Sequence, residues 1–152
     1  QRIGTFKCND GGSAIVYDDY GHHPTEIEMT LRALRAAELP KRLICVFQPH
    51  QHSRTRFLLD QFAQSFSSAD EVIVPHIYFV RDSIAEQHRV CAQDLVDKLS
   101  DQGASAKHIN DFGDIVHHLQ TTARDGDLIV VMGAGPVTTI AHSLAGSSQL
   151  TT

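Results

Sequence analysis

The sequence predicts a three-layer α/β domain whose central sheet is mostly parallel and has about six strands. Two observations lead to this fold class. Short apolar segments alternate with segments of helical periodicity along most of the 152 residues, which is typical of parallel strands joined by helical crossovers. An Asn-Asp-Gly-Gly turn near the start predicts an antiparallel edge strand. With helices on both faces, the arrangement is Rossmann-like.

The chain is predicted to open with a hairpin. Residues 3–7 can pair with residues 13–17, because the Asp-Gly and Gly-Gly steps between them supply the positive φ angles of a tight turn. The later elements are then predicted in alternation: strand 14–18, helix 24–38, strand 42–47, helix 54–67, strand 71–75, helix 89–100, strand 107–109, helix 112–123, strand 127–132 and helix 137–145.

Local signals support several of these elements. Pro24 suits a first helical turn, Glu26 suits the positive end of a helix, and Pro40 disfavours helix at the residue before it. The apolar runs at 43–47 and 128–132 are unbroken, so these two strands are predicted to be central. Residues 76–89 show no regular pattern, and residues 147–152 are predicted to fray.

Composition narrows the classes of function. The length and a hydrophobic content of 41% suit one domain with a real core. A net charge of −5 argues against a nucleic-acid partner, and no apolar run is long enough to cross a membrane. The three cysteines are scattered, which predicts neither disulfides nor a cysteine zinc site. We therefore expect a cytoplasmic domain without a membrane or nucleic-acid partner.

Polar side chains follow two of the predicted strands. Residues 18–26 read DDYGHHPTE between a strand and a helix, and residues 48–56 read QPHQHSRTR after the next strand. Ligands of open α/β sheets bind at the carboxyl ends of strands. The two segments can therefore face one cleft.

Arg54 and Arg56 are predicted in the first turn of a helix whose N-cap is Ser53. Cations oppose the helix dipole there, so an anion should offset them. One interpretation is a substrate carboxylate or phosphate held by Arg54 and by N–H groups at the helix end. The other is that both arginines face solvent or pair with an aspartate.

The two polar segments together resemble the paired signature of the C-terminal domain of the Mur ligase family, in the alanine-adding branch. The resemblance extends from residue 1 to about residue 144. It implies that Arg54 holds the carboxylate of an incoming L-alanine and that Tyr20 lines the alanine pocket. His22 and His50 would lie near the amino acid and the reacting carbonyl, where a neutral imidazole can position the attacking amine.

The same resemblance implies further roles. Asp19 would accept hydrogen bonds from the ribose hydroxyls of ATP, while Asp18 would cap local backbone groups. Many relatives have arginine where this chain has Gln51, a substrate-site position. Arg81 and Asp82 would lie near the interdomain face. The Gly133 to Pro136 loop would form a wall of the cleft with a possible nucleotide contact.

The resemblance also implies a reaction. The alanine-adding branch of the family joins L-alanine to UDP-N-acetylmuramate at the expense of ATP, through an acyl phosphate and with Mg²⁺, in peptidoglycan synthesis. The chain contains no G-x-x-x-x-G-K-[ST] phosphate loop and does not begin with methionine. Residues 1–152 are therefore expected to be one domain of a three-domain enzyme, inactive by itself, with Mg²⁺ bound mainly by the central domain.

Three alternatives stay open. The chain could belong to a related Mur ligase that attaches a peptide instead of alanine. It could be a Rossmann-type module that binds a nucleotide without catalysis. A histidine-rich metallohydrolase is the third, although the spacing of His22, His23, His50 and His52 is weak support for a metal site and we predict none.

Overall fold

A six-stranded sheet with the strand order β1-β2-β6-β3-β4-β5 forms the middle layer of the computed structural model, which describes residues 1–146. The strands are β1 (Arg2–Lys7), β2 (Ser13–Asp19), β3 (Arg42–Phe47), β4 (Glu71–Val74), β5 (Ala106–His108) and β6 (Asp127–Met132). Only the β1–β2 pair is antiparallel among these strands. The predicted fold class and the central positions of β3 and β6 are thereby confirmed.

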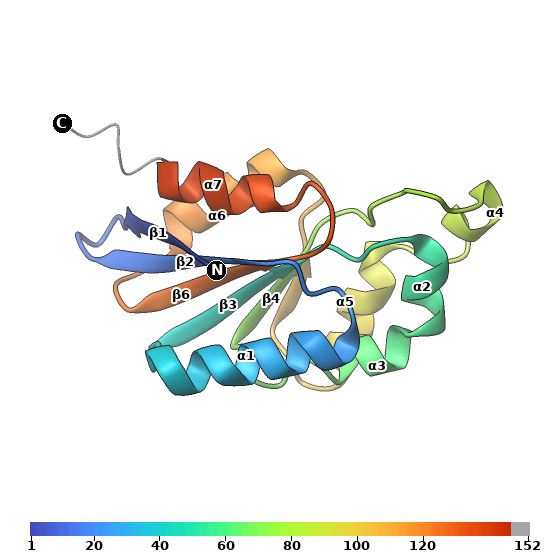
Figure 1. The fold of residues 1–152 in the computed structure, drawn as a ribbon, viewed down its shortest axis with the longest axis horizontal. Coiled ribbons are helices and arrows are strands. Elements are labelled where there is room, and N and C mark those ends of the chain that lie inside the picture. The colour runs from blue at the N-terminus through green and yellow to red at the C-terminus, as the bar shows by residue number, and fades with distance from the viewer. Residues whose placement is uncertain (147–152) are drawn as a thin grey trace.

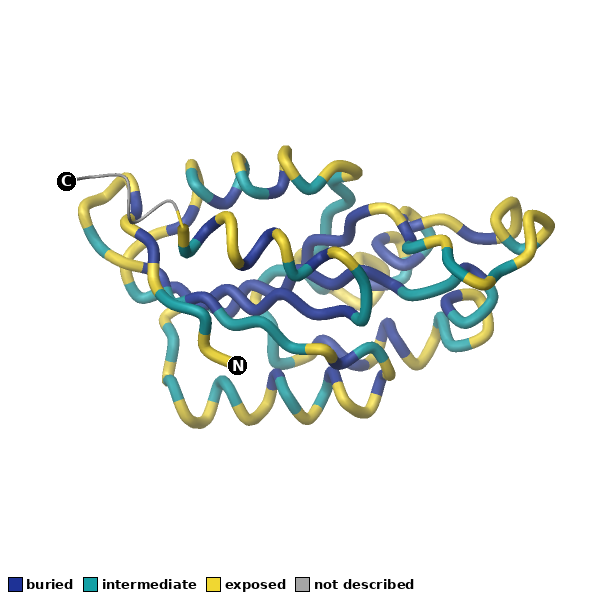
Figure 2. Tube along the Cα trace, turned by 45° about the horizontal axis from the view of Figure 1, so that its top comes forward, coloured by how far each residue is buried: buried dark blue, intermediate teal, exposed yellow. Residues whose placement is uncertain are grey.

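Helices cover both faces of the sheet (Figure 1). The helices are α1 (Pro24–Glu38), α2 (His52–Phe57), α3 (Leu59–Ala63), α4 (Ile84–Gln87), α5 (Ala92–Asp101), α6 (Phe112–Thr122) and α7 (Thr138–Gly146), of which α4 projects away from the sheet. Successive residues of β3 point to opposite faces, and so each face has its own core. Leu43, Cys45 and Phe47 pack toward α1, α3 and α5, whereas Ile44 and Val46 pack toward α6 and α7. Figure 2 shows the buried residues concentrated in the strands and on the inner sides of helices.

The first helix agrees with its prediction, and its start has a cap that the sequence interpretation missed. The Nδ1 atom of His23 accepts a hydrogen bond from the N–H of Thr25, and the Glu26 carboxylate accepts one from the N–H of His23. The two bonds form a reciprocal capping box. His23 therefore has a structural role at the start of α1.

The predicted helix 54–67 is wrong in its bounds. The structure has two short helices, α2 and α3, with Leu58 between them outside helical geometry, and turns follow at 64–68. The break accompanies the packing of Phe62 and Phe66 on Phe47, with ring centroids 5.3 and 5.4 Å apart. Burial of these rings outweighs the local preference for one continuous helix.

The irregular segment 76–89 contains one short helix, α4. Ser83 caps it by accepting a hydrogen bond from the N–H of Glu86 through its hydroxyl oxygen. The pattern Ser-x-x-Glu at 83–86 was the available signal. Residues 147–152, predicted to fray, lie outside the described part of the chain. Within residues 1–146, no helix has the length and apolarity needed to cross a membrane.

Candidate functional site

The two polar segments meet at the carboxyl edge of the sheet, on either side of the end of β6. The Asp19 carbonyl accepts from the N–H of Gly133, and the N–H of Gln48 donates to the carbonyl of Met132. These bonds tie both strand exits to the same central strand. As a result, the rings of His22 and His50 lie with their centroids 6.0 Å apart. The sequence prediction that the two exits share one site is consistent with this geometry.

The exit of β2 is shaped by a tight turn. One carboxylate oxygen of Asp19 accepts a hydrogen bond from the N–H of Gly21 at 2.7 Å. A Cβ atom at position 21 would lie 2.7 Å from the same oxygen, so any other residue there would displace this carboxylate. The turn directs His22 toward His50, whereas the Tyr20 ring is largely exposed and meets His22 edge-on at a centroid distance of 6.2 Å. In this domain Tyr20 therefore has an open face available for a ligand.

The two neighbouring acids have different partners. The Asp18 carboxylate accepts a hydrogen bond from the Thr138 hydroxyl at 2.7 Å, which fastens β2 to α7. The expectation that Asp18 caps local backbone groups is wrong, because Thr138 comes from the other end of the chain. Asp19 also borders a cavity of about 250 Å³ between β2 and α1, lined in addition by Tyr17 and Leu34.

The exit of β3 runs beside the segment that follows β4. The N–H of Tyr78 donates to the carbonyl of Pro49, and the N–H of Gln51 donates to the carbonyl of Tyr78. Residues 49–53 and 78–82 therefore lie side by side, although nearly 30 positions separate them in sequence. The His50 and Tyr78 rings face each other across this pairing at a centroid distance of 5.5 Å. Sequence reasoning did not find this pairing, because segment 76–89 carries no periodicity.

Asp82 caps the start of α2. Its carboxylate accepts hydrogen bonds from the N–H groups of His52 and Ser53, at 2.5 and 3.2 Å. Burial opposes the charged form, but the hydrogen bonds from Ser53 and His52 hold the pKa of Asp82 below its usual value. The predicted N-cap Ser53 is wrong, since the helix begins at His52, two residues earlier than predicted, after Gln51. Asp82 also occupies the N–H groups that were expected to bind a ligand anion.

Arg54 and Arg56 differ in their surroundings. The Arg56 guanidinium pairs with the Glu86 carboxylate at 2.9 Å. Arg54 is half-buried, and its guanidinium has no acidic partner among residues 1–146. The sequence left open whether these arginines bind a substrate anion or pair with an acid of the chain. Arg56 pairs with an acid, whereas Arg54 is available for an anion.

The ring of His50 is kept neutral by its surroundings. Burial lowers the pKa of His50 most, and the nearby charges of Arg54, His22 and Arg81 lower it further. Its Nδ1 atom is buried and has no hydrogen-bond partner in the described part of the chain. A neutral imidazole with an unpaired nitrogen can accept a hydrogen bond from an amine.

Stability should fall as the pH drops through the ordinary pKa of histidine, about 6.5. The pKa values of His50 and His52 are lowered in the fold, in both cases first by burial. The unfolded chain therefore takes up protons that the folded chain does not. The midpoint of thermal unfolding, compared between about pH 7.5 and about pH 5.5, should fall less in His50→Gln than in the wild type. An equal fall in both proteins would refute the assignment to His50.

The glycine loop after β6 packs against the same site. A Cβ atom at Gly135 would lie 2.6 Å from the Tyr78 ring, and one at Gly133 would lie 2.8 Å from Val137. Close packing explains both glycines. The loop thus packs on Tyr78, whose ring lies beside that of His50.

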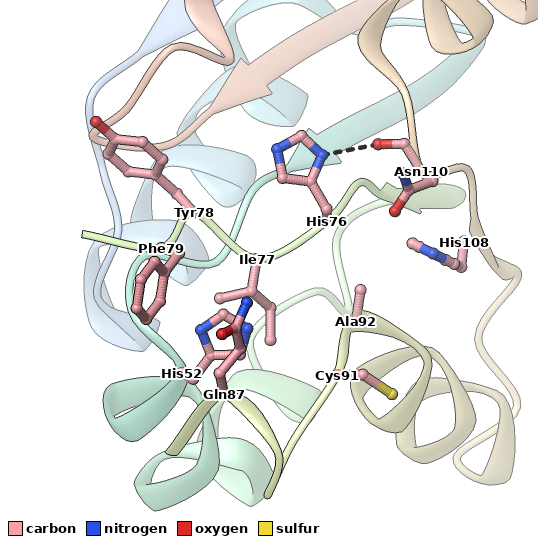
Figure 3. A pocket seen from close by; sticks show the side chains of 10 residues that line it. All are labelled: His52, His76, Ile77, Tyr78, Phe79, Gln87, Cys91, Ala92, His108 and Asn110. Atoms are coloured by element: carbon pink, nitrogen blue, oxygen red, sulfur yellow. Dashed lines mark hydrogen bonds between the residues drawn. The ribbon is translucent and has the colours of Figure 1, made fainter. Parts of the chain in front are cut away.

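A separate cavity of about 470 Å³ is bounded by residues 76–79. Figure 3 shows the side chains that line it, among them His52, His76, Cys91 and His108. The Nδ1 atoms of His76 and His108 lie 2.9 and 2.7 Å from the carbonyl oxygens of Asn110 and Val74. These two rings are therefore engaged with the backbone. In residues 1–146, no group of three His, Cys, Asp or Glu side chains is placed to hold a metal ion.

Comparisons with known proteins identify the relatives of this domain. Residues 2–135 match the model of the family described as Mur ligase, glutamate ligase domain. The UDP-N-acetylmuramate–L-alanine ligase of Acetivibrio thermocellus is 40% identical over 135 residues, which cover 89% of this chain and 28% of that protein. The ligase of the same name from Clostridium novyi is 46% identical over 123 residues, covering 80% and 26%. The chain thus spans just over a quarter of the length of these relatives.

Solved structures show the same fold at low sequence identity. A murein peptide ligase from Psychrobacter arcticus has a TM-score of 0.70 at 22% identity, covering 100% of this chain and 30% of that chain. The UDP-N-acetylmuramate–alanine ligase of Thermotoga maritima has a TM-score of 0.67 at 20% identity, covering 97% and 29%. A folylpolyglutamate synthase/dihydrofolate synthase from Yersinia pestis, complexed with AMPPNP and manganese, has a TM-score of 0.57 at 16% identity, covering 87% and 28%.

Proposed function

The chain belongs to the Mur ligase family, and from this premise we propose that the whole protein joins L-alanine to UDP-N-acetylmuramate in an ATP-dependent reaction of cytoplasmic peptidoglycan synthesis. The observation that carries the proposal is that His22, His50 and Arg54 lie together at one edge of the sheet. Among residues 1–146, Arg54 has no acidic partner. The names of relatives at 40 to 46% identity support the same reaction.

The chain's own residues suit the amino-acid half of this reaction. Arg54 offers a guanidinium to the carboxylate of alanine. The neutral ring of His50 can accept a hydrogen bond from the alanine amine and hold it for attack, and His22 stands beside it. The exposed Tyr20 ring can pack on the alanine methyl group. Gln51 lines the same exit, but its amide nitrogen donates to backbone carbonyls.

ATP with Mg²⁺ would supply the phosphoryl group that activates the muramate carboxylate as an acyl phosphate. Asp19 fits the ribose: one of its oxygens binds Gly21, the other is left to accept from sugar hydroxyls, and a cavity of about 250 Å³ lies next to it. We assign the Mg²⁺ ligands and the phosphate loop to the central domain of the longer protein. Closure of this domain onto that one would exclude water from the activated carboxylate.

The test compares two proteins: residues 1–152, and the same domain within its full-length parent. Phosphate release is measured with UDP-N-acetylmuramate, ATP, Mg²⁺ and L-alanine. We expect alanine-dependent release from the full-length protein alone, because the phosphate-binding parts belong to the other domains. Ligation by residues 1–152 alone would contradict the assignment of phosphate binding to the other domains. Release that depends on a peptide in place of alanine would assign the protein to the peptide-attaching branch.

A further inference from the structure

The segment after β4 brings a second arginine to the site. Three sets of hydrogen bonds fasten it to the exit of β3: Tyr78 pairs with Pro49 and Gln51 through backbone atoms, the Gln51 side chain binds carbonyls of the segment, and Asp82 caps α2. Arg81 lies between these attachments. The position of Arg81 is therefore set by the hydrogen bonds to the exit of β3 and not by β4 alone.

Gln51 holds the backbone of Arg81 directly. Its amide nitrogen lies 3.2 Å from the Val80 carbonyl oxygen and 3.4 Å from that of Arg81. Arg81 has a φ of 51°, and Gln51 itself has a φ of 68°. Non-glycine residues rarely adopt this left-handed region, and they keep it where the surroundings determine it. The side chain of Gln51 thus fixes the conformation from which the Arg81 side chain departs.

Two arginine charges act on His50. Arg54, His22 and Arg81 are the groups whose charges act on it. In residues 1–146, neither Arg54 nor Arg81 has an acidic side chain within ion-pair distance, whereas Arg42, Arg35 and Arg56 each have at least one. Asp82, the sequence neighbour of Arg81, is committed to the N–H groups of α2. Two uncompensated guanidinium groups beside a neutral imidazole favour an anion with more than one acceptor oxygen.

We propose that Arg81 is a second cationic contact for the carboxylate of the incoming amino acid, opposite Arg54, and that Gln51 positions it. This inference rests on the proposed ligase function. Each guanidinium would donate to one side of the carboxylate, which leaves the amine free to face His50. Gln51 would then act on the substrate through Arg81, so that its role is positioning.

The test measures KM for L-alanine and for ATP in the full-length enzyme. Arg81→Ala and Arg81→Gly should each raise the alanine KM by about tenfold, the loss expected for one charge-assisted hydrogen bond, with little change in the ATP KM. The glycine variant separates the loss of charge from backbone strain, because glycine tolerates the φ of 51°. Arg81→Lys keeps the charge and should lose less than either.

Gln51→Ala should shift the alanine KM in the same direction. The double variant Gln51→Ala, Arg81→Ala should be no worse than Arg81→Ala alone, since the positioning residue then has nothing left to position. The matched control is Arg124→Ala, which removes an arginine that also has no acidic side chain within ion-pair distance in the described residues but lies shortly before β6, at the opposite edge. It should leave both KM values unchanged.

The outcomes separate the two proposals. Additive effects in the double variant would overturn the positioning role of Gln51. An unchanged alanine KM in both Arg81→Ala and Arg81→Gly, with an active wild type, would overturn the role of Arg81. A wild-type protein with no alanine-dependent phosphate release would overturn the proposed function itself.

Discussion

Replacing Arg54 with alanine in the full-length enzyme is expected to raise the KM for L-alanine by about 10- to 140-fold, or about 1.5 to 3 kcal/mol, the range for hydrogen bonds to charged groups. The KM for ATP should change little. Arg54 is half-buried beside His50, and no acid among residues 1–146 neutralises it. Its loss would leave the substrate carboxylate without its main partner, and steady-state kinetics with each substrate varied in turn measure the effect.

Arg56→Ala is the matched control for this prediction. It removes an arginine from the same short helix, but one whose guanidinium is paired with Glu86 near the protein surface. Exposed pairs contribute little, so both KM values should stay near those of the wild type. Equal increases in the alanine and ATP KM values in Arg54→Ala would contradict a role in binding the alanine carboxylate.

Phe47→Ala should have the largest effect on stability, a loss of about 3 to 5 kcal/mol in the free energy of unfolding. Phe47 is fully buried at the end of β3 and contacts the rings of Phe62 and Phe66. Its removal leaves a cavity below α3, directly before the segment that carries His50. Urea unfolding followed by circular dichroism measures the change.

Phe57→Ala removes the same ring from a position where it is 85% exposed. Surface substitutions of this kind usually change stability by less than about 0.5 kcal/mol. A loss in Phe47→Ala no larger than the loss in Phe57→Ala would show that the aromatic cluster under β3 does not hold the fold together.

Elements with strong local signals were predicted well. α1 has a proline at its start and apolar positions at helical spacing, and its bounds agree with the structure. The unbroken apolar runs of β3 and β6 correctly predicted central strands, because a strand covered on both faces needs apolar residues at every position. The hairpin of β1 and β2 followed from its turn residues.

Elements that depend on distant partners were predicted less well. Nothing local in residues 54–67 shows that the helix breaks at Leu58, since the break accompanies packing of Phe62 and Phe66 on a different element. Ser53 looked like an N-cap because serine usually serves as one. The carboxylate that caps α2 comes from Asp82, about thirty residues later.

The sequence alone thus determined the fold class and the two polar strand exits, because periodicity and motifs are local properties, and the family resemblance of those exits led to the proposal that His22, His50 and Arg54 are site residues. Tertiary structure alone decided which charges surround those residues. The pairing of segments 49–53 and 78–82 brings Arg81 to His50 and assigns Asp82 to α2. Hydrogen bonds between segments so far apart produce no periodic pattern in the sequence. They form because the fold places both segments at one edge of the sheet, and so only the tertiary structure shows them.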